Sequence, residues 1–593
     1  MTLPAVLTLV VIAGALVLMM TDRVAPDVAL LGAVVLLSAL GVLPAEAALA
    51  GFGAPAMLTV AALFVVAAGL SETGAVSLLT TRVLGRPRGT RRALLRLTGP
   101  VVFVSAFLNN TTVVAALLPG VRDWAARIGV PASRLLLPLS YAALLGGTCT
   151  LIGTSTNLVV AGMVMERLGT HPGLVPLGMF DLTWVGIPVA LVGIVVIVML
   201  GPWLLPDRRP PVSADGDPSR YAMEAVVPVG SRLAGLTIED AGLRHLPGAF
   251  LMEIVRGDKV LPAVDGSRRL DVGDRLVFVG DASAAVDLHN VPGLAAADEA
   301  VFTLSAPGQP RVILEAVVSH RNPLVGSTIR DAGFRTRYHA VVIAVARSGE
   351  RLSGRIGDIV LRAGDVLLLE AQPDFLPAHR RSAEFYFVNT VGGGEPRRAG
   401  RAGFALLVLL GFVVTAGLDV VSSSTGALLA AGLMVAGGCL SVDAARRAPD
   451  LQVLVAIAAS FGLGHAMQST GLAAILAGGI TALGPRDPLF ALVLVYLATA
   501  VLTELLSNNA AAVLSLPFAL ALAQEVGAQP MPFVIVVTMA ASASFVMPIG
   551  YQTHLMVMGP GGYRPSDFPR LGLPLSLACA VTTLLIVPRI WPL

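Results

Sequence analysis

The chain has 593 residues, of which 55% are hydrophobic and only 13% are charged, and its formal net charge is +3. A soluble protein of this length needs more charge on its surface, so the composition predicts a polytopic α-helical membrane protein. The small net charge gives no indication of nucleic acid binding, and the three cysteines, which lie far apart in apolar segments (Cys149, Cys439 and Cys579), indicate neither a disulfide framework nor a metal site.

The first apolar run covers residues 1–20 and has two interpretations, a cleaved signal peptide or a first transmembrane helix. No basic residue precedes the run, whereas a signal peptide begins with a basic region. A second apolar run, over residues 27–43, follows almost at once. We therefore predict that residues 1–20 form a transmembrane helix that the protein retains.

Polarity then changes sharply twice along the chain. Residues 1–206 are membrane-like, residues 207–400 are charged and rich in predicted strands, and residues 401–593 are membrane-like again. This order predicts two transmembrane repeats that flank a soluble α+β insert. The insert itself divides into residues 207–298 and 299–400, because each part shows the order strand, short helix, strand, turn and strand. No Gly-x-Gly-x-x-Gly turn follows a strand, so we expect no dinucleotide site.

In the first half, the polar pair Asn109-Asn110 interrupts an apolar run over residues 98–118. Arginines flank this run on both sides, and arginine-rich loops lie on the cytoplasmic side of a membrane. Because both ends then lie on one side, we predict a re-entrant hairpin with Asn109-Asn110 at its tip. About 45 residues later, residues 153–157 interrupt another apolar run and predict a broken helix.

The second half contains the same two features. Residues 507–509 interrupt an apolar run over residues 488–521, and residues 550–554 interrupt the next run. Loop charges give this hairpin the opposite orientation, and matched points of the two halves lie 397 to 399 positions apart, as Asn157 and His554 do. Paired interruptions in oppositely oriented halves predict an inverted repeat, and such breaks mark the binding site of a transporter.

The polar residues at the tips and breaks are the predicted binding residues. Freed backbone carbonyls and the oxygens of Ser, Thr and Asn favour Na⁺, whereas helix N-termini favour anions. For the anionic substrate we expect Asn110, Thr111, Thr156, Asn157, Asn509, Thr553 and His554. For Na⁺ we expect Asn109, Asn110, Thr154, Asn157, Ser507, Asn508 and Gly550. The alternative is that these side chains only hydrogen-bond helices to one another, as polar residues in membrane bundles do.

The ionisable residues of the apolar segments have two interpretations each. His554 takes the place of Asn157, either as a proton-coupled or anion-binding group or as a replacement that keeps one hydrogen bond. Glu72, Glu504 and Asp419 are candidates for an ion or proton route. A helix-end position is the alternative for Glu72 and Glu504.

At these motifs the chain resembles the divalent anion:sodium symporter family of the ion transporter superfamily. Residues 147–157 are similar to the family's first broken-helix motif, and residues 547–563 are similar to its second. Ser507-Asn508-Asn509 is similar to the family's Ser-Asn-Thr hairpin signature. The insert resembles two tandem TrkA C-terminal (RCK-C) domains, which bind small regulatory ligands in other transporters.

The resemblance implies a secondary active transporter that imports a small, divalent anion, such as sulfate or a dicarboxylate, together with Na⁺ by elevator-type alternating access. It also implies a homodimer in a lipid membrane, with residues 207–400 in the cytoplasm and an unidentified small ligand on the RCK-C-like domains. We expect a multi-pass protein of a bacterial inner (plasma) membrane. No catalytic constellation is present in the sequence, so we expect no enzyme activity.

The chain departs from the family pattern at both tips. Leu108 takes the place of a serine in the first tip, and Ala510 takes the place of the threonine in the second. These departures leave the number of Na⁺ sites open. Because Ala510 and His554 replace the matched residues Thr111 and Asn157, we expect the better cation site in the first half.

Other functions fit part of the sequence. A proton-coupled anion transporter or a cation/proton antiporter is the alternative within transport. A membrane sensor would bind a ligand at the insert without transport, but the complete set of polar breaks disfavours it. A ligand-gated channel is suggested by the RCK-C-like insert alone, and the sequence has no Thr-Val-Gly-Tyr-Gly-like filter.

Overall fold

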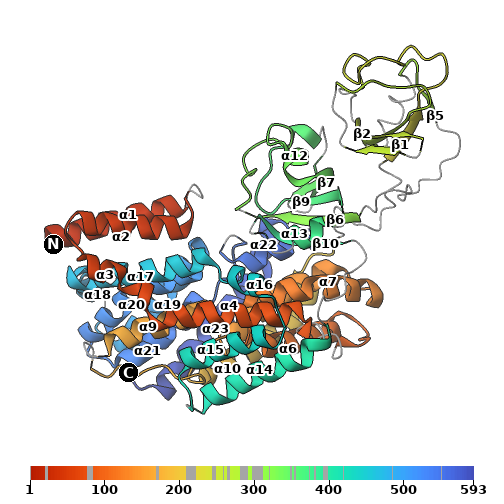
Figure 1. The fold of residues 1–593 in the computed structure, drawn as a ribbon. Coiled ribbons are helices and arrows are strands. Elements are labelled where there is room, and N and C mark those ends of the chain that lie inside the picture. Colours follow the sequence, from red (N-terminus) through yellow and green to blue (C-terminus); the bar gives the residue numbers. More distant parts are fainter. Residues whose placement is uncertain are drawn as a thin grey trace. The chain divides into compact units, whose positions relative to one another are not determined.

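The structure of the protein is a computed structural model (Figure 1). It describes residues 2–20, 24–75, 84–168, 172–208, 222–243, 249–257, 259–262, 267–280, 291–296, 312–319, 321–347, 350–352, 356–372, 374–379, 382, 384–390, 399–418, 420–483, 485–548 and 550–593. Asp419, one of the candidate ion or proton groups, lies outside the described residues.

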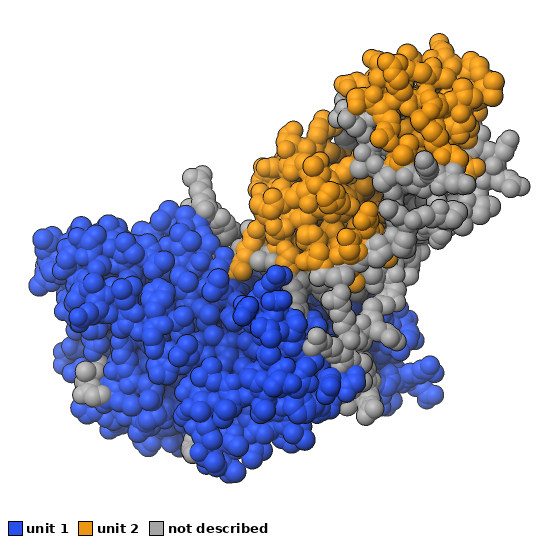
Figure 2. Space-filling model, viewed as in Figure 1, with its two compact units in different colours: residues 1–207, 395–557, 565–593 blue, residues 208–394, 558–564 orange. Residues whose placement is uncertain are grey.

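The chain separates into two compact units (Figure 2). The helical unit comprises residues 1–207, 395–557 and 565–593, and the β unit comprises residues 208–394 and 558–564. The helical unit is built from the two apolar halves. The short segment 558–564 belongs to the β unit, although most of the second apolar half separates it from the insert in the sequence.

The described part of the first half is helical and apolar. Its α-helices are α1 (Leu3–Met20), α2 (Pro26–Ala39), α3 (Ala45–Leu49), α4 (Pro55–Glu72), α6 (Thr90–Ser105), α7 (Asn110–Ile128), α8 (Leu136–Gly147), α9 (Ser155–Arg167) and α10 (Thr183–Leu204). α2 and α4 begin with proline. At the first position of a helix the backbone N–H has no acceptor within the helix, so the lack of an N–H in proline costs no hydrogen bond there. The short 3-10 turn η2 (Ala132–Arg134) joins α7 to α8.

The described part of the second half has the same character. Its α-helices are α14 (Ala402–Gly417), α15 (Ser423–Ala436), α16 (Val442–Arg447), α17 (Leu451–Ser469), α18 (Leu472–Leu483), α19 (Pro488–Leu505), α20 (Asn508–Glu525), α21 (Pro530–Ala541), α22 (Gln552–Met558) and α23 (Phe568–Ile590). Helix breaks therefore occur at both predicted tips, between α6 and α7 and between α19 and α20. They also occur at both predicted broken helices, between α8 and α9 and between α21 and α22.

Within the described residues, five helical segments are long and apolar enough to cross a membrane. These segments are Ala45–Glu72, Thr183–Leu204, Leu451–Ser469, Pro488–Leu505 and Pro565–Ile590. Other apolar helices, such as α1, α2 and α21, are shorter. Of these, α21 ends at a helix break, as expected for a helix interrupted at membrane depth.

Helices from the two halves pack against one another. α4 packs on α15, α2 on α17 and α10 on α23. One buried cluster joins α1 and α2 to α17 and α20, with Leu37 and Ala510 fully buried in it. The two halves therefore share a hydrophobic core and form one helical unit.

The described residues of the β unit form two five-stranded antiparallel sheets with the same topology. The strands are β1 (Ala222–Val226), β2 (Ala249–Arg256), β3 (Lys259–Pro262), β4 (Arg275–Gly280), β5 (Ala295–Ala296), β6 (Val312–Val318), β7 (Ala340–Arg347), β8 (Glu350–Arg351), β9 (Val366–Ala371) and β10 (Phe385–Thr390). The first β module has the order β3-β2-β4-β1-β5, and the second, read from its other edge, has the order β8-β7-β9-β6-β10. Each strand of the first module thus has a counterpart in the second.

An ion pair between a partly exposed arginine and a buried aspartate holds the same turn in each module. Arg256 donates two hydrogen bonds to Asp274, at 2.7 and 2.8 Å, and Arg347 donates two to Asp365 at the same distances. Both aspartates are fully buried, and the hydrogen bonds to them raise the pKa of Arg256 and of Arg347. The turn glycines before them, Gly273 and Gly364, adopt φ values of +86° and +85°, which favour glycine.

Replacing Asp365 by asparagine is expected to loosen the second β module and to leave the first unchanged. The change removes the negative charge that Arg347 binds, and a hydrogen bond to a charged group contributes about 2 kcal/mol. Amide hydrogen exchange in β6, β7 and β9 should then rise about thirtyfold, since it follows the free energy of local opening. Hydrogen-exchange mass spectrometry of the whole chain measures this effect. Asp274→Asn is the matched control and should act on β1, β2 and β4 only; equal protection of both modules in both variants contradicts the prediction.

Candidate functional site

At each of the two predicted tips a side chain caps the helix that follows. Asn109 caps α7 by accepting a bond from the Thr111 N–H at 3.0 Å, and Ser507 caps α20 by accepting one from the Ala510 N–H at 3.4 Å. Such caps satisfy backbone donors that a helix start leaves free, which is why the helices begin here.

The first residue of each tip helix is an asparagine whose side chain is held from the preceding helix. The Ser105 hydroxyl donates to Asn110 Oδ1 at 2.9 Å, and the Thr503 hydroxyl donates to Asn508 Oδ1 at 2.9 Å. Both asparagines are buried.

These contacts correct the match between the two tips by one residue. The sequence comparison pairs Thr111 with Ala510, whereas the caps and the asparagine contacts pair Asn110 with Asn508. Thr111 is then matched by Asn509, which is also polar. The helix caps, rather than the repeated Asn-Asn pair, therefore decide which residues of the two tips correspond.

A buried side chain braces each broken helix in the same way. Asn157 Nδ2 donates to the carbonyl of Gly147 at 3.0 Å and to that of Thr150 at 2.8 Å. His554 Nε2 donates to the carbonyl of Ser544 at 2.8 Å. In both cases the residue lies ten positions after the carbonyl that it reaches, and both side chains are fully buried.

The second ring nitrogen of His554 is also hydrogen-bonded. Since a carbonyl can only accept, Nε2 carries a proton, and Nδ1 lies 2.8 Å from the hydroxyl of Ser140 on α8. The same hydroxyl lies 2.7 Å from that of Thr553. The geometry therefore favours His554 as a replacement that keeps the brace of Asn157, and Thr553 joins the same network.

Each tip is also clamped to the break of its own half. In the first half the Thr150 hydroxyl donates to the carbonyl of Ala106. In the second half the Glu504 carboxylate accepts bonds from three successive N–H groups of the break, those of residues 545, 546 and 547, at 2.9, 2.9 and 2.7 Å. Both oxygens of Glu504 are thereby engaged by the backbone, which gives this residue a structural place in the site.

A glycine lets each break approach its tip. A Cβ atom on Gly153 would lie 2.6 Å from the Gly147 carbonyl oxygen and 3.0 Å from that of Ala106. A Cβ atom on Gly550 would lie 3.1 Å from the Thr503 carbonyl oxygen, and it would collide with the Ser544 hydroxyl. Only glycine fits at these points, and backbone oxygens converge on both of them.

The tips also reach across to the other half. Asn110 Nδ2 donates to the hydroxyl of Tyr551, 441 positions later, at 2.9 Å. Asn509 Oδ1 accepts bonds from the hydroxyls of Thr156 and Ser155, at 3.0 and 3.3 Å. The prediction groups each tip with the break of its own half; the structure adds a bond from each tip to the opposite break.

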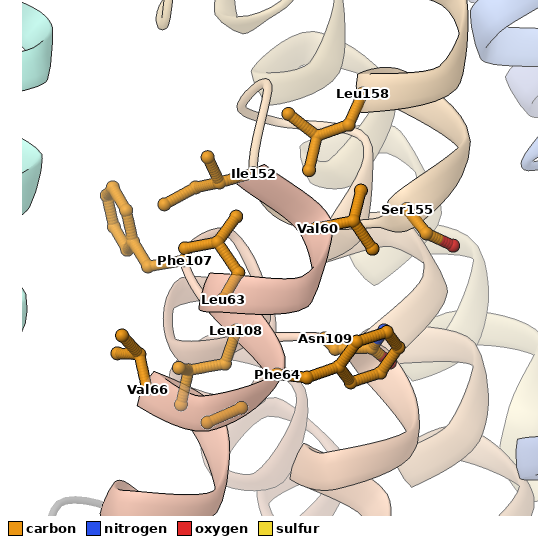
Figure 3. A pocket seen from close by; sticks show the side chains of 11 residues that line it. Val60, Leu63, Phe64, Val66, Phe107, Leu108, Asn109, Ile152, Ser155 and Leu158 are labelled. Carbon is orange, nitrogen blue, oxygen red and sulfur yellow. The ribbon is translucent and has the colours of Figure 1, made fainter. Parts of the chain in front are cut away.

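The first tip and the first break line one pocket (Figure 3). It has about 380 Å³ of empty space, open solvent included. Asn109 and Ser155 provide polar groups at this pocket, and Val60, Leu63 and Phe64 of α4 provide an apolar wall. The other predicted residue at this break, Thr154, is buried at the start of α9.

Several residues of the site were not predicted from the sequence: Ser105, Ser140, Thr150, Thr503, Ser544 and Tyr551. Tyr551 lies inside the second broken-helix motif, so its position was a signal that the prediction did not use. Ser105 and Ser140 are single serines in apolar helices, and nothing in the local sequence distinguishes them from ordinary helix-packing serines.

Comparison with known proteins gives matches over nearly the whole chain. The family model described as citrate transporter matches residues 16–538 and 491–593. A Chlamydomonas reinhardtii protein whose name refers to regulation of the sulfur deprivation response is 38% identical over 572 residues, which cover 94% of this chain and 97% of the relative. An uncharacterized transporter of Synechocystis is 34% identical over 598 residues, 99% of this chain and 97% of the relative. Sodium/sulfate cotransporter 2 of Chlamydomonas reinhardtii is 28% identical over 767 aligned positions, 95% of this chain and 87% of the relative.

Replacing His554 by asparagine is expected to preserve the second break, because Asn157 already performs the same task at the same spacing. Replacing it by leucine leaves the Ser544 carbonyl without a donor, which costs about 1–3 kcal/mol for a buried group. The midpoint of thermal unfolding in detergent should therefore be clearly lower for His554→Leu than for His554→Asn. Equal midpoints for the two variants contradict the conclusion that the hydrogen bond from residue 554 to the Ser544 carbonyl stabilises the second break.

Proposed function

The chain belongs to the citrate transporter family, and from this premise we propose that it is a secondary active transporter that imports sulfate or a related small anion together with Na⁺. Its family makes it a transporter and not an enzyme, and its apolar helices make it a multi-pass membrane protein. The names of relatives such as sodium/sulfate cotransporters 1 and 2 support the anion and the coupling ion. A dicarboxylate is the other substrate that we consider.

The contact between the second tip and the first break is the observation that supports anion binding best. The bonds from Asn509 bring the start of α20 against the start of α9. Both helices are longer than three turns, and the N–H groups of their first turns have no partner within the helix. Two helix N-termini that meet present partial positive charge to the same point, which favours a small anion without any basic side chain. We propose that Asn110, Thr111, Thr156, Asn509 and Thr553 surround this anion, with Asn157 and His554 holding the breaks beside it.

The oxygens around the two break glycines support Na⁺ as the coupling ion. The carbonyls of Ala106 and Gly147 converge at Gly153, and the carbonyl of Thr503 and the hydroxyl of Ser544 converge at Gly550. Neutral oxygens suit a hard monovalent cation. Among the residues that the structure describes, no group of three or more His, Cys, Asp or Glu side chains suits a transition metal. We propose that these oxygens bind Na⁺ with Asn109, Asn110, Thr154, Asn157, Ser507, Asn508 and Gly550.

We further propose that the two halves form an inverted repeat with re-entrant hairpins and work by elevator-type alternating access. The matched caps, braces and clamps support a repeat. A sodium ion that carries net charge inward gains about 2.3 kcal/mol per 100 mV. The chain would form a homodimer in a bacterial inner membrane.

We propose that the β modules are cytoplasmic RCK-C-like domains that bind a small regulatory ligand. Two modules of one topology, joined in tandem, support this proposal. The helical repeats would then cover residues 1–206 and 401–593, and the two domains residues 207–298 and 299–400.

Sulfate uptake into proteoliposomes tests the transport proposal. An inward Na⁺ gradient is expected to drive uptake, and Asn110→Ala or Asn509→Ala should lower it at least about tenfold, the effect of losing about 1.4 kcal/mol of binding. Gln468→Ala is the control, because Gln468 carries an exposed side chain at the end of α17. Normal uptake in both tip variants contradicts the site, and uptake driven by a pH gradient without Na⁺ selects proton coupling instead.

A further inference from the structure

Residues 558–564, which we call the seat loop, begin at the last residue of α22 of the candidate site. Thr553 and His554 of α22 belong to the hydrogen-bond network described above, whereas the seat loop belongs to the β unit (Figure 2). Residues 559–563 are all buried. One continuous stretch of chain therefore runs from the candidate site into the β unit.

The seat loop rests on the turn that opens β9 of the second β module. A Cβ atom on Gly559 would lie 3.6 Å from Val366 Cβ and 3.6 Å from the Gly364 carbonyl oxygen, and it would collide with a methyl group of Val366. Residue 559 must therefore be glycine for the loop to come this close. Arg208 adds a second attachment, because its side chain donates to the Gly562 carbonyl at 3.3 Å.

The turn under the seat loop is held rigidly. Asp365, between Gly364 and Val366, is the buried partner of Arg347. The backbone of this turn is also bonded to β6, since the Val318 N–H donates to the Asp365 carbonyl at 2.8 Å and the Gly364 N–H donates to the Val318 carbonyl at 2.8 Å. A movement of this turn therefore involves the sheet of the second module.

The first β module provides an internal comparison. Its matched turn has the same glycine and aspartate, Gly273 and Asp274, but the residue in the place of Val366 is Arg275. Val366 is only 3% exposed, whereas Arg275 is exposed. The two modules share their topology and their ion pair but differ at the surface on which the seat loop lies.

We propose that the seat loop couples the second β module to α22, so that the state of this module sets the rate of transport; this inference rests on the proposed function. Gly559 follows His554 by five residues, about 7.5 Å along a helix. Alternating access requires the broken helices to change position, and a loop buried on the second module can follow α22 only when the module releases it. Fastening the loop to the module should slow transport.

A disulfide between residues 559 and 366 tests this coupling. In Gly559→Cys/Val366→Cys the second change removes the methyl group that a Cβ on residue 559 would strike, and the Cβ separation of 3.6 Å lies within the range of disulfides. The three native cysteines are buried, so the introduced pair is the one expected to oxidise. Mass spectrometry should show the disulfide. The oxidised protein should take up sulfate at least about fivefold more slowly than the reduced protein, as for coupling between two sites. Reductant should restore the rate.

Gly559→Cys/Arg275→Cys is the matched control and should neither form a disulfide nor change its rate on oxidation. Absence of a disulfide between residues 559 and 366 overturns the contact between the seat loop and the second β module. A disulfide that leaves uptake unchanged overturns the coupling of this module to transport. Hydrogen exchange of α22 gives a readout that does not depend on transport: oxidation should increase its protection, and unchanged protection also overturns the coupling. Absence of sulfate uptake in the unmodified protein contradicts the proposed function alone.

Discussion

The candidate site depends on how the carbonyls freed at two helix breaks find donors inside the protein. Hydrocarbon offers no water to a free carbonyl, so each one must be satisfied by the protein itself. Asn157 and His554 provide this donor at the same spacing, although one is an amide and the other an imidazole. The constraint fixes the position of the donor and leaves its chemical type free, which explains how a histidine can take the place of an asparagine.

The same constraint explains both the symmetry and the asymmetry of the two halves. Each tip helix starts with a cap and a held asparagine, and each break passes its tip at a glycine. The clamps differ in charge: the first half uses the Thr150 hydroxyl, whereas the second uses the Glu504 carboxylate. The two halves therefore differ in charge at Glu504. The sequence comparison had instead located the difference between the tips at Ala510.

The polar interruptions could be found from the sequence because an asparagine in an apolar run is costly and therefore informative. The breaks at residues 109 and 507 were found in this way. The match between the tips was wrong by one residue, since residue identity does not reveal which side chain caps a helix. Contacts between distant residues were also beyond the sequence: Arg347 lies 18 positions before Asp365, and Ser140 meets His554 only after the helices pack. The place of the seat loop in the β unit likewise follows from packing and not from any local pattern.

The bond between Asn110 and Tyr551 also constrains how the protein is made. The two residues are 441 positions apart, and ribosomes add about 5–20 residues per second. The first tip is therefore complete about 20–90 s before its partner leaves the ribosome. During this interval the Asn110 amide nitrogen lacks its Tyr551 partner, and only the bond from Ser105 holds the side chain of Asn110.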